Sequence, residues 1–171
     1  LDENVLRDLE IFETTRRRQN EGSLFSVINH CMTPMGTRLL RACLCQPLRT
    51  VDKIVERHTY VKNFVDQGEV ELSQLRAHLK GCHDLERLAV KMSKQFIDPL
   101  ELDKVRRTLV KIRDLRDEAI KSNIKPLLSL LEAPYIAIAP LLTKLEDSLK
   151  TEIGTLGAGD QVFTEGVDPS L

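Results

Sequence analysis

Residues 22–48, GSLFSVINHCMTPMGTRLLRACLCQPL, contain two helix starts and one helix stop. Ser23 precedes a run of apolar residues and can accept a hydrogen bond from a free N–H group at the start of a helix. This pattern predicts a capped and largely buried helix over residues 24–31. A second helix follows at once, because Thr33 can cap it and Pro34 suits its first position, where the missing N–H costs nothing.

Pro47 ends the second helix, because its ring cannot continue the helical hydrogen bonds and pushes the preceding residue toward extended geometry. Apolar residues recur at helical spacing between Pro34 and this stop. We therefore expect two helices to meet at a stiff corner. Its hinge residues are predicted to be Thr33, Pro34, Gly36 and Pro47.

Three motifs stand in order along this stretch: Gly22-Ser23-Leu24, Thr33-Pro34-Met35-Gly36-Thr37-Arg38-Leu39-Leu40 and Gln46-Pro47-Leu48. Their order and spacing resemble the opening of the core, or lever, domain of the MutS family of DNA mismatch repair proteins. Further matches extend the resemblance over nearly the whole chain, although Val167 stands where the family usually has an aromatic residue. They are Leu1-Asp2, Leu9-Glu10-Ile11, Ile54-x-x-Arg57-x-x-x-Val61, Asp84-Leu85-Glu86-Arg87-Leu88 and Glu165-Gly166-Val167-Asp168-x-x-Leu171.

The resemblance implies that this chain is the first sequence half of a lever domain. Residues 1–153 would form the helical domain, and residues 154–171 a Gly-rich linker and extended arm leading toward the clamp. In the MutS family the levers join the DNA-encircling clamp to the ATPase dimer, which implies a non-catalytic segment that couples the two. Arg38 and Arg57 fall on family-matching positions and are candidates for ion pairs or domain-junction contacts.

The resemblance also assigns cofactors and partners to a longer parent protein, of which we expect this chain to be a piece. ATP and magnesium are implied for the parent, and no cofactor or metal is expected in this segment. The parent would bind mismatched double-stranded DNA through other domains, pair with a MutS-like homo- or heterodimer partner and act with a MutL-like downstream protein. Its place would be the cytoplasm or nucleoid of a prokaryote, or the nucleus of a eukaryote.

Apolar periodicity over the rest of the chain predicts an all-α fold, an elongated helical bundle with a short extended C-terminal arm. The strongest helix starts with Asp98 as cap, Pro99 in the first turn and Glu101 reaching back as in a capping box. Its apolar stripe runs over residues 102–115 and on to Ala119. Shorter amphipathic helices are predicted over residues 51–65, 72–79 and 85–92.

The C-terminal third is predicted to contain two further helices. One covers residues 124–131, Pro134 separates it from the next, and the last helix runs over residues 136–149 with Pro140 as a kink or a delayed start. Residues 161–164 have the length and composition of a short strand or extended arm.

Composition excludes several classes of function. The net charge of −1 and the 4% of aromatic residues give little means to bind nucleic acid without sequence preference. The chain has no G-x-x-x-x-G-K-[ST] phosphate loop, no CxxC pair and no uninterrupted apolar run of 18 residues, so we expect no nucleotide site, no zinc site and no membrane span. Three of the four cysteines are expected to lie within or beside apolar helical faces, and free, buried thiols suit a reducing compartment.

Charged residues on the longest predicted helix are interpreted as a solvated face. Acidic side chains are interleaved with the basic ones and cancel much of their field. The residues concerned are Lys104, Arg106, Arg107, Lys111 and Arg113, with Asp103, Asp114 and Asp117.

Three alternatives stay open from the sequence. A stand-alone interaction module could dock partner helices through the apolar stripe of residues 102–115, provided that this stripe is exposed. The chain could contact DNA directly. A MutS relative of the meiotic, crossover-directing branch would share the same segment.

Overall fold

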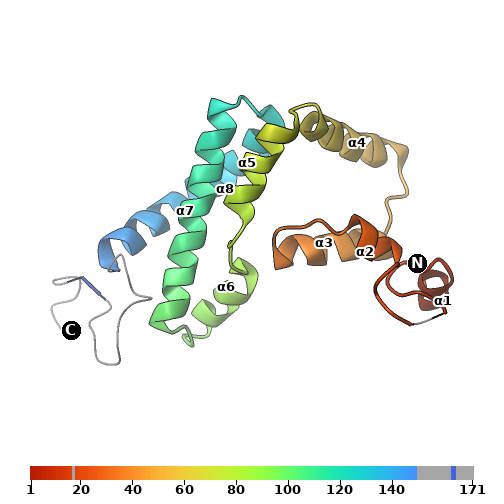
Figure 1. Cartoon of the computed structure of the whole chain (residues 1–171). Helices are drawn as coiled ribbons and strands as arrows, with labels where there is room; N and C mark the ends of the chain where they lie inside the picture. The colour runs from red at the N-terminus through yellow and green to blue at the C-terminus, as the bar shows by residue number, and fades with distance from the viewer. Residues whose placement is uncertain (17, 150–162, 165–171) are drawn as a thin grey trace. The chain divides into compact units, whose positions relative to one another are not determined.

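The computed structural model describes residues 1–16, 18–149 and 163–164. These residues form helices and no strand, which confirms the predicted all-α class, and they divide into two compact units, Leu1–Asp66 and Gln67–Leu171. Figure 1 labels the helices, which are α1 (Glu3–Asp8), α2 (Leu24–Ile28), α3 (Pro34–Cys45), α4 (Val51–Val65), α5 (Glu69–Leu79), α6 (Leu85–Ser93), α7 (Pro99–Lys121) and α8 (Lys125–Ser148).

In the first unit, α2 is shorter and more exposed than the sequence predicted. It ends at Ile28, and none of its residues is buried; the side chain of Val27 is 63% exposed. The prediction of a largely buried helix over residues 24–31 is therefore wrong. The early end has a local cause, because the Asn29 side chain accepts a hydrogen bond from the Cys31 N–H at 3.3 Å and so offers the backbone a turn in place of a further helical bond.

The boundaries of α3 and α4 follow the sequence, whereas α1 was not predicted. α3 begins after Thr33 and ends one residue before Gln46-Pro47, and α4 covers the predicted residues 51–65. The apolar residues of α4 do not form a buried stripe within the unit, since Val51, Val55, Val61 and Val65 are all exposed.

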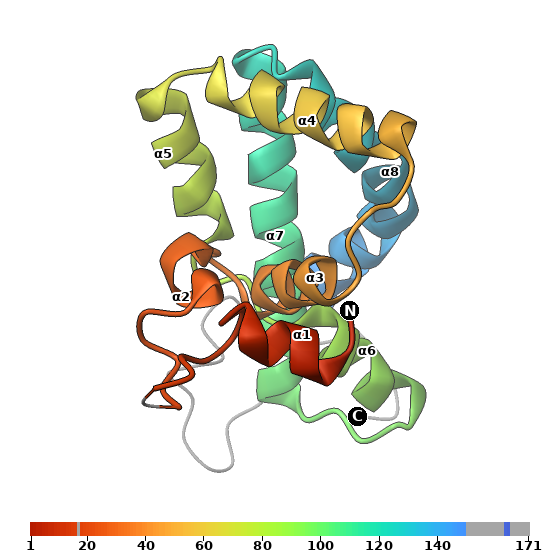
Figure 2. The ribbon, with the colours of Figure 1, turned by 90° about the vertical axis from the view of Figure 1, so that its right-hand side faces the viewer.

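In the second unit, α7 packs against α5, α6 and α8, and Figure 2 shows it lying between α5 and α8. It is about 35 Å long at about 1.5 Å per residue. The predicted capping box at its start is present: Asp98 accepts a hydrogen bond from the Glu101 N–H, and the Glu101 side chain accepts one from the Asp98 N–H. The core joins the two long helices to α6 and consists of Leu88, Val105, Leu109, Leu142, Leu145 and Leu149.

A tight turn reverses the chain between α7 and α8. Asn123 has a φ of 53°, and its N–H donates to the Ile120 carbonyl, while the Ile124 N–H donates to the Ala119 carbonyl. This hydrogen-bond pattern closes the end of a helix, and Ile124 and Ala119, both fully buried, provide the apolar contact that accompanies it. The turn brings α8 back along α7.

α8 is one helix rather than the two that the sequence predicted. Pro134 was expected to separate two helices, but α8 continues through both Pro134 and Pro140. A proline inside a helix deprives the carbonyl four residues earlier of its donor. Both prolines are exposed, as are Leu130 and Ile136, which carry those carbonyls, so solvent can take the place of the missing donors.

By length and composition α8 could cross a membrane, with a mean hydropathy of 1.4 over its most apolar window. The sequence expectation of no span rested on the absence of an uninterrupted apolar run. A core helix that passes this test is mostly buried, whereas 6% of this window is buried; α8 nevertheless buries Leu142 and Leu145 and forms ion pairs with α7 through Glu132 and Glu146. These contacts favour a helix partnered within its own unit.

Two described residues belong to the predicted C-terminal arm. Phe163 forms an isolated antiparallel bridge with Leu149, and Thr164 donates from its N–H to the Ser148 carbonyl at 2.9 Å and from its hydroxyl to the Asp147 carbonyl at 2.7 Å. The remainder of the arm, the domain boundary at residue 153 and the motif at residues 165–171 lie outside the described residues.

Truncating the core between α7 and α8 should destabilise the protein strongly. We expect Leu142→Ala to lower the free energy of unfolding by about 2–5 kcal/mol, because it leaves a cavity beside Leu109 and Leu145. Urea unfolding followed by far-UV circular dichroism measures this. Leu130→Ala on the same helix is the control, since that side chain is 53% exposed and should change stability by less than about 1 kcal/mol. Equal losses in the two variants would contradict the assigned core.

Candidate functional site

The corner between α2 and α3 is built from two capped helix starts. The Ser23 hydroxyl accepts from the Ser26 N–H at 3.2 Å, and the Thr33 hydroxyl accepts from the Gly36 N–H at 3.1 Å. Pro34 occupies the first turn of α3, as the sequence predicted. The cap bonds and the fixed φ of proline restrict how the chain enters α3.

Gly36 is placed where a side chain would disturb this cap. A Cβ atom built on Gly36 would lie 3.2 Å from the Thr33 hydroxyl oxygen and 3.5 Å from the Cys31 Cβ atom. The first of these separations is tighter than ordinary van der Waals contact. Glycine at this position therefore allows the start of α3 to approach the preceding residues closely. Pro47 is exposed and follows the last residue of α3 by two positions.

The segment before α2 completes the corner. The backbone N–H groups of Leu24 and Phe25 donate to the carbonyls of Glu10 and Ile11 at 3.1 and 2.8 Å. These are N–H groups of the first turn, which no carbonyl of their own helix can satisfy. Ile11 and Ser23 are the buried residues at this junction.

An aromatic cluster that sequence reasoning missed packs against α3. Phe12 and Phe25 meet edge to face at 5.5 Å between ring centroids, and the Arg41 guanidinium lies 3.9 Å from the Phe12 centroid. A cation over an aromatic face is attracted by the ring quadrupole, which makes the face electron-rich. The chain has five phenylalanines, so two of them close together in sequence could have indicated an aromatic contact. Nothing in the sequence paired either of them with Arg41.

The two predicted junction arginines lie in different surroundings. Arg38 is half-buried on α3, whereas Arg57 is exposed on α4, and no ion pair joins Arg57 to a residue in the described part of the chain. The hinge role of Thr33, Pro34, Gly36 and Pro47 and the junction role of Arg38 and Arg57 stay predictions.

A cavity of about 730 Å³ lies in the first unit beside this corner. Arginine and acidic side chains both line it, among them Arg7, Arg18, Arg41, Glu3 and Glu13. Because the two signs of charge are mixed, the lining favours no particular class of ligand.

In the second unit, ion pairs connect the two long helices. Arg113 donates to Glu146 at 2.9 Å, and Arg116 donates two hydrogen bonds to Glu132 at 3.0 and 3.1 Å. The Arg116 guanidinium also lies 4.7 Å from the centroid of the Tyr135 ring. Such forked pairs fix geometry as well as adding attraction.

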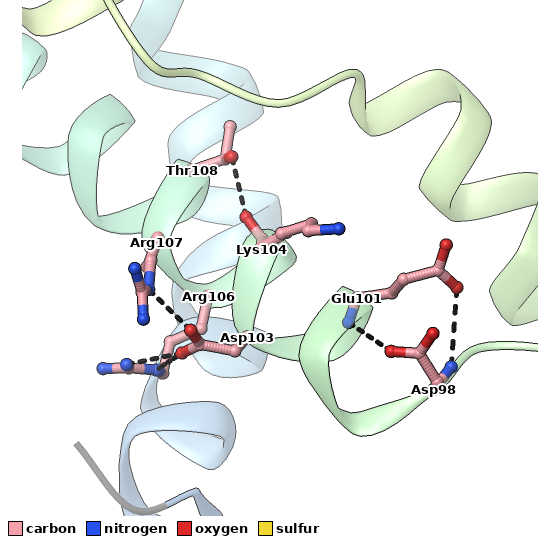
Figure 3. A network of polar contacts seen from close by, with 7 residues as sticks. All are labelled: Asp98, Glu101, Asp103, Lys104, Arg106, Arg107 and Thr108. Atoms are coloured by element: carbon pink, nitrogen blue, oxygen red, sulfur yellow. Dashed lines mark hydrogen bonds and ion pairs between the residues drawn. The ribbon is translucent and has the colours of Figure 1, made fainter. Parts of the chain in front are cut away.

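Asp103 is the most buried charge on α7, with 3% of the residue exposed. It accepts hydrogen bonds from Arg106 at 2.6 and 3.0 Å and pairs with Arg107 at 2.5 Å, as Figure 3 shows. A buried carboxylate is tolerated only when its charge is compensated, and here two cations share it. The interpretation of the α7 charges as a solvated face is therefore wrong for Asp103, Arg106 and Arg113, which make specific pairs.

The cysteines are less buried than the sequence predicted. Cys31 is exposed, and Cys43, Cys45 and Cys82 are half-buried; all four are free. Desolvation raises the pKa of Cys82 above its ordinary value, and the nearby Lys111 opposes this. The Cys82 thiol donates to the His78 carbonyl of α5 at 3.5 Å.

Comparison with protein families decides what this helical segment is. The family model described as MutS domain III matches residues 4–160. This chain belongs to the MutS family. The match confirms the resemblance seen in the corner motifs.

The relatives of this MutS segment are named DNA mismatch repair protein MutS. The chain is 38% identical to the protein of Exiguobacterium sp. over 116 residues, which are 68% of this chain and 14% of that protein. It is 31% identical to the protein of Thermodesulfovibrio yellowstonii over 172 aligned positions, 100% of this chain and 20% of that protein. It is 30% identical to the protein of Streptococcus equi subsp. equi over 161 residues, which are 94% of this chain and 17% of that protein. The chain thus spans a fifth or less of these relatives' length.

Removing the Thr33 cap should loosen the start of α3 in this MutS segment. We expect Thr33→Val to cost about 1 kcal/mol, because the Gly36 N–H loses its acceptor while the side chain keeps its shape. Chemical denaturation measures the loss. Thr59→Val in the middle of α4 is the matched control, since its hydroxyl only returns to the Val55 carbonyl of its own helix. A loss at Thr59 as large as that at Thr33 would argue against the cap.

The pair between Arg116 and Glu132 should make stability depend on pH. The hydrogen bonds from Arg116 lower the pKa of Glu132 below its ordinary value of 4.5. A lowered pKa in the folded state gives stability that is present above pH 4.5 and is lost as the pH falls through the folded pKa.

Glu132→Gln should therefore lower the Tm at neutral pH. The difference in Tm between this variant and the unsubstituted chain should vanish in acid. Thermal melts across this range measure it. Glu56→Gln, an exposed change on α4, is the control and should leave the Tm unchanged. A difference in Tm between the unsubstituted chain and Glu132→Gln that persists in acid would contradict the charge-dependent pair.

Proposed function

We propose that this chain is the non-catalytic lever segment of a DNA mismatch repair protein. In this role it carries conformational changes between the part of the parent that holds mismatched DNA and the part that binds ATP. The observation that carries the proposal is the packing of α7 against α8 by a buried core, with ion pairs at Arg113 and Arg116. The names of the relatives support repair, rather than the meiotic branch, as the process served.

The packing suits mechanical transmission. Close-packed interiors resist small deformations, so a displacement at one end of a packed helix pair moves the pair as a body. The core residues lie along both helices, from Val105 on α7 to Leu145 on α8, and the Glu132 and Glu146 pairs fix their relative register. Coupling between distant sites amounts typically to about 1–3 kcal/mol, so a modest loosening can erase it.

The corner of α2 and α3 is the proposed hinge. The Thr33 cap, Pro34 and the close approach at Gly36 fix the entry into α3, and Pro47 fixes its exit. Arg38 and Arg57 are proposed to contact neighbouring domains of the parent. The chemistry itself belongs elsewhere: ATP and magnesium would be bound by the ATPase domains, mismatched DNA by the reader and clamp, and the assembly would be a dimer that recruits a MutL-like protein.

The stand-alone docking module is the less supported function. It required an exposed stripe over residues 102–115, but Val105, Leu109 and Leu115 are buried within the second unit. The side chains that would have bound a partner helix instead pack inside their own unit.

Altering both ends of α3 in the full-length parent should uncouple ATP from DNA. We expect Pro47→Gly with Gly36→Val to leave mismatch binding and ATP hydrolysis measurable while the ATP-induced change in DNA affinity shrinks by about 5- to 150-fold, the factor equivalent to the coupling energy. DNA dissociation constants with and without ATP measure this ratio.

Gln46→Gly with Ala42→Val is the control for this experiment. It makes the same kinds of change at exposed Ala42 of α3 and at exposed Gln46, which directly follows α3, but keeps the Thr33 cap and Pro47. An unchanged ATP effect in the corner variant would refute the hinge assignment. Equal loss in both variants would show a general requirement for α3 rather than for its two ends.

A further inference from the structure

Basic side chains gather where the loop between α5 and α6 meets α7. The Thr108 hydroxyl, 1% exposed, accepts from the His83 N–H at 3.0 Å and donates to the Lys104 carbonyl at 2.8 Å. Lys111 donates from Nζ to the Lys80 carbonyl at 2.9 Å. Two contacts therefore hold the loop on α7, and neither uses the ammonium groups of Lys80 or Lys104.

Three of these cations lie on one face of α7. Lys104, Arg107 and Lys111 are three and four residues apart, the spacing that places side chains in a row along a helix. Lys80 adds a fourth cation from the loop. Lys80, Lys104 and Arg107 are exposed, and Lys111 is half-buried. Figure 3 shows the Lys104 side chain directed away from the Asp103 pairs. These four residues are called the cation cluster below.

His83 reports the sign of the local field. Desolvation lowers its pKa most, and Lys104, Arg107 and Lys111 each lower it further, whereas Asp103 alone raises it. The charge of Asp103 is shared between Arg106 and Arg107. Three cations and one carboxylate thus act on the His83 imidazole, although Asp84 follows it in the loop and the chain as a whole has a net charge of −1.

We propose that the cation cluster, Lys80, Lys104, Arg107 and Lys111, contacts the phosphate backbone of duplex DNA. The choice of DNA rests on the proposed function, while the preference for an anion rests on the cluster. A row of cationic side chains about one helical turn apart, two ammonium groups and the Arg107 guanidinium that also pairs with Asp103, can reach successive phosphates. The cluster contains no aromatic residue on which a base could stack. The contact is therefore independent of the DNA sequence and adds to affinity rather than to specificity.

Binding by the isolated chain should be weak and sensitive to salt. If three phosphates are neutralised, affinity should fall by about 40-fold between about 50 mM and about 200 mM salt. Fluorescence anisotropy of a short labelled duplex with the 171-residue chain measures this. Lys80→Glu with Lys104→Glu should weaken binding at least 10-fold at the lower salt and reduce the salt slope by about two.

Lys53→Glu with Lys62→Glu on α4 is the matched control. It makes the same change in net charge with exposed lysines and should leave most of the binding intact. Should circular dichroism show that the glutamate pair unfolds the chain, Lys80→Gln with Lys104→Gln takes its place. Equal losses in the cluster and control variants would overturn the proposal, as would binding that does not depend on salt.

The His83 imidazole gives a local readout. Followed by NMR titration, its pKa should rise when the duplex is added, because phosphates nearby favour the charged form. DNA binding without a shift at His83 would place the contact elsewhere and refute the proposal. Tighter binding of polyglutamate than of DNA would assign the cluster to an acidic protein partner instead. A negative result in these DNA-binding experiments would not affect the outcome of the Pro47→Gly with Gly36→Val experiment on the full-length parent, so the two proposals are tested separately.

Discussion

The burial of α7 against α8 is the interaction on which the second unit depends. Each leucine fully buried there contributes about 1.5–3 kcal/mol relative to an exposed position. The ion pairs between the helices are partly exposed and contribute less, because solvent screens their charges. The apolar core therefore supplies the stability, and the pairs at Glu132 and Glu146 select one register of the two helices.

The same packing orders the charges of α7. With Val105 and Leu109 fixed in the core, Asp103 is drawn below the surface, where Arg106 and Arg107 compensate its charge. Lys104 and Lys111 then lie beside the loop that Thr108 and Lys111 hold against α7. A rigid element that also presents cations is suited to sense DNA held by other domains, which connects the proposed lever with the proposed backbone contact.

Local signals predicted most helix boundaries. Thr33 and Asp98 act as caps where the sequence placed them, and Pro47 follows the end of α3, because each effect involves residues no more than four positions apart. Other helix ends had no such signal. The residues that close the ends of α1 and α7, Glu10 and Asn123, have a positive φ, for which glycine is the commonest residue. The residue after each of them, Ile11 or Ile124, is buried, and this burial offsets the cost of the strained backbone.

The sequence by itself determined the helical class, the starts of the main helices and membership of a family, since periodicity, caps and motifs are all written in neighbouring residues. Tertiary structure alone decided which apolar stripes are buried, that α8 runs through Pro134, that Arg41 stacks on Phe12, and that three cations of α7 act on His83 in the loop before α6. These outcomes depend on residues far apart in the chain, whose contacts are fixed only when the helices pack.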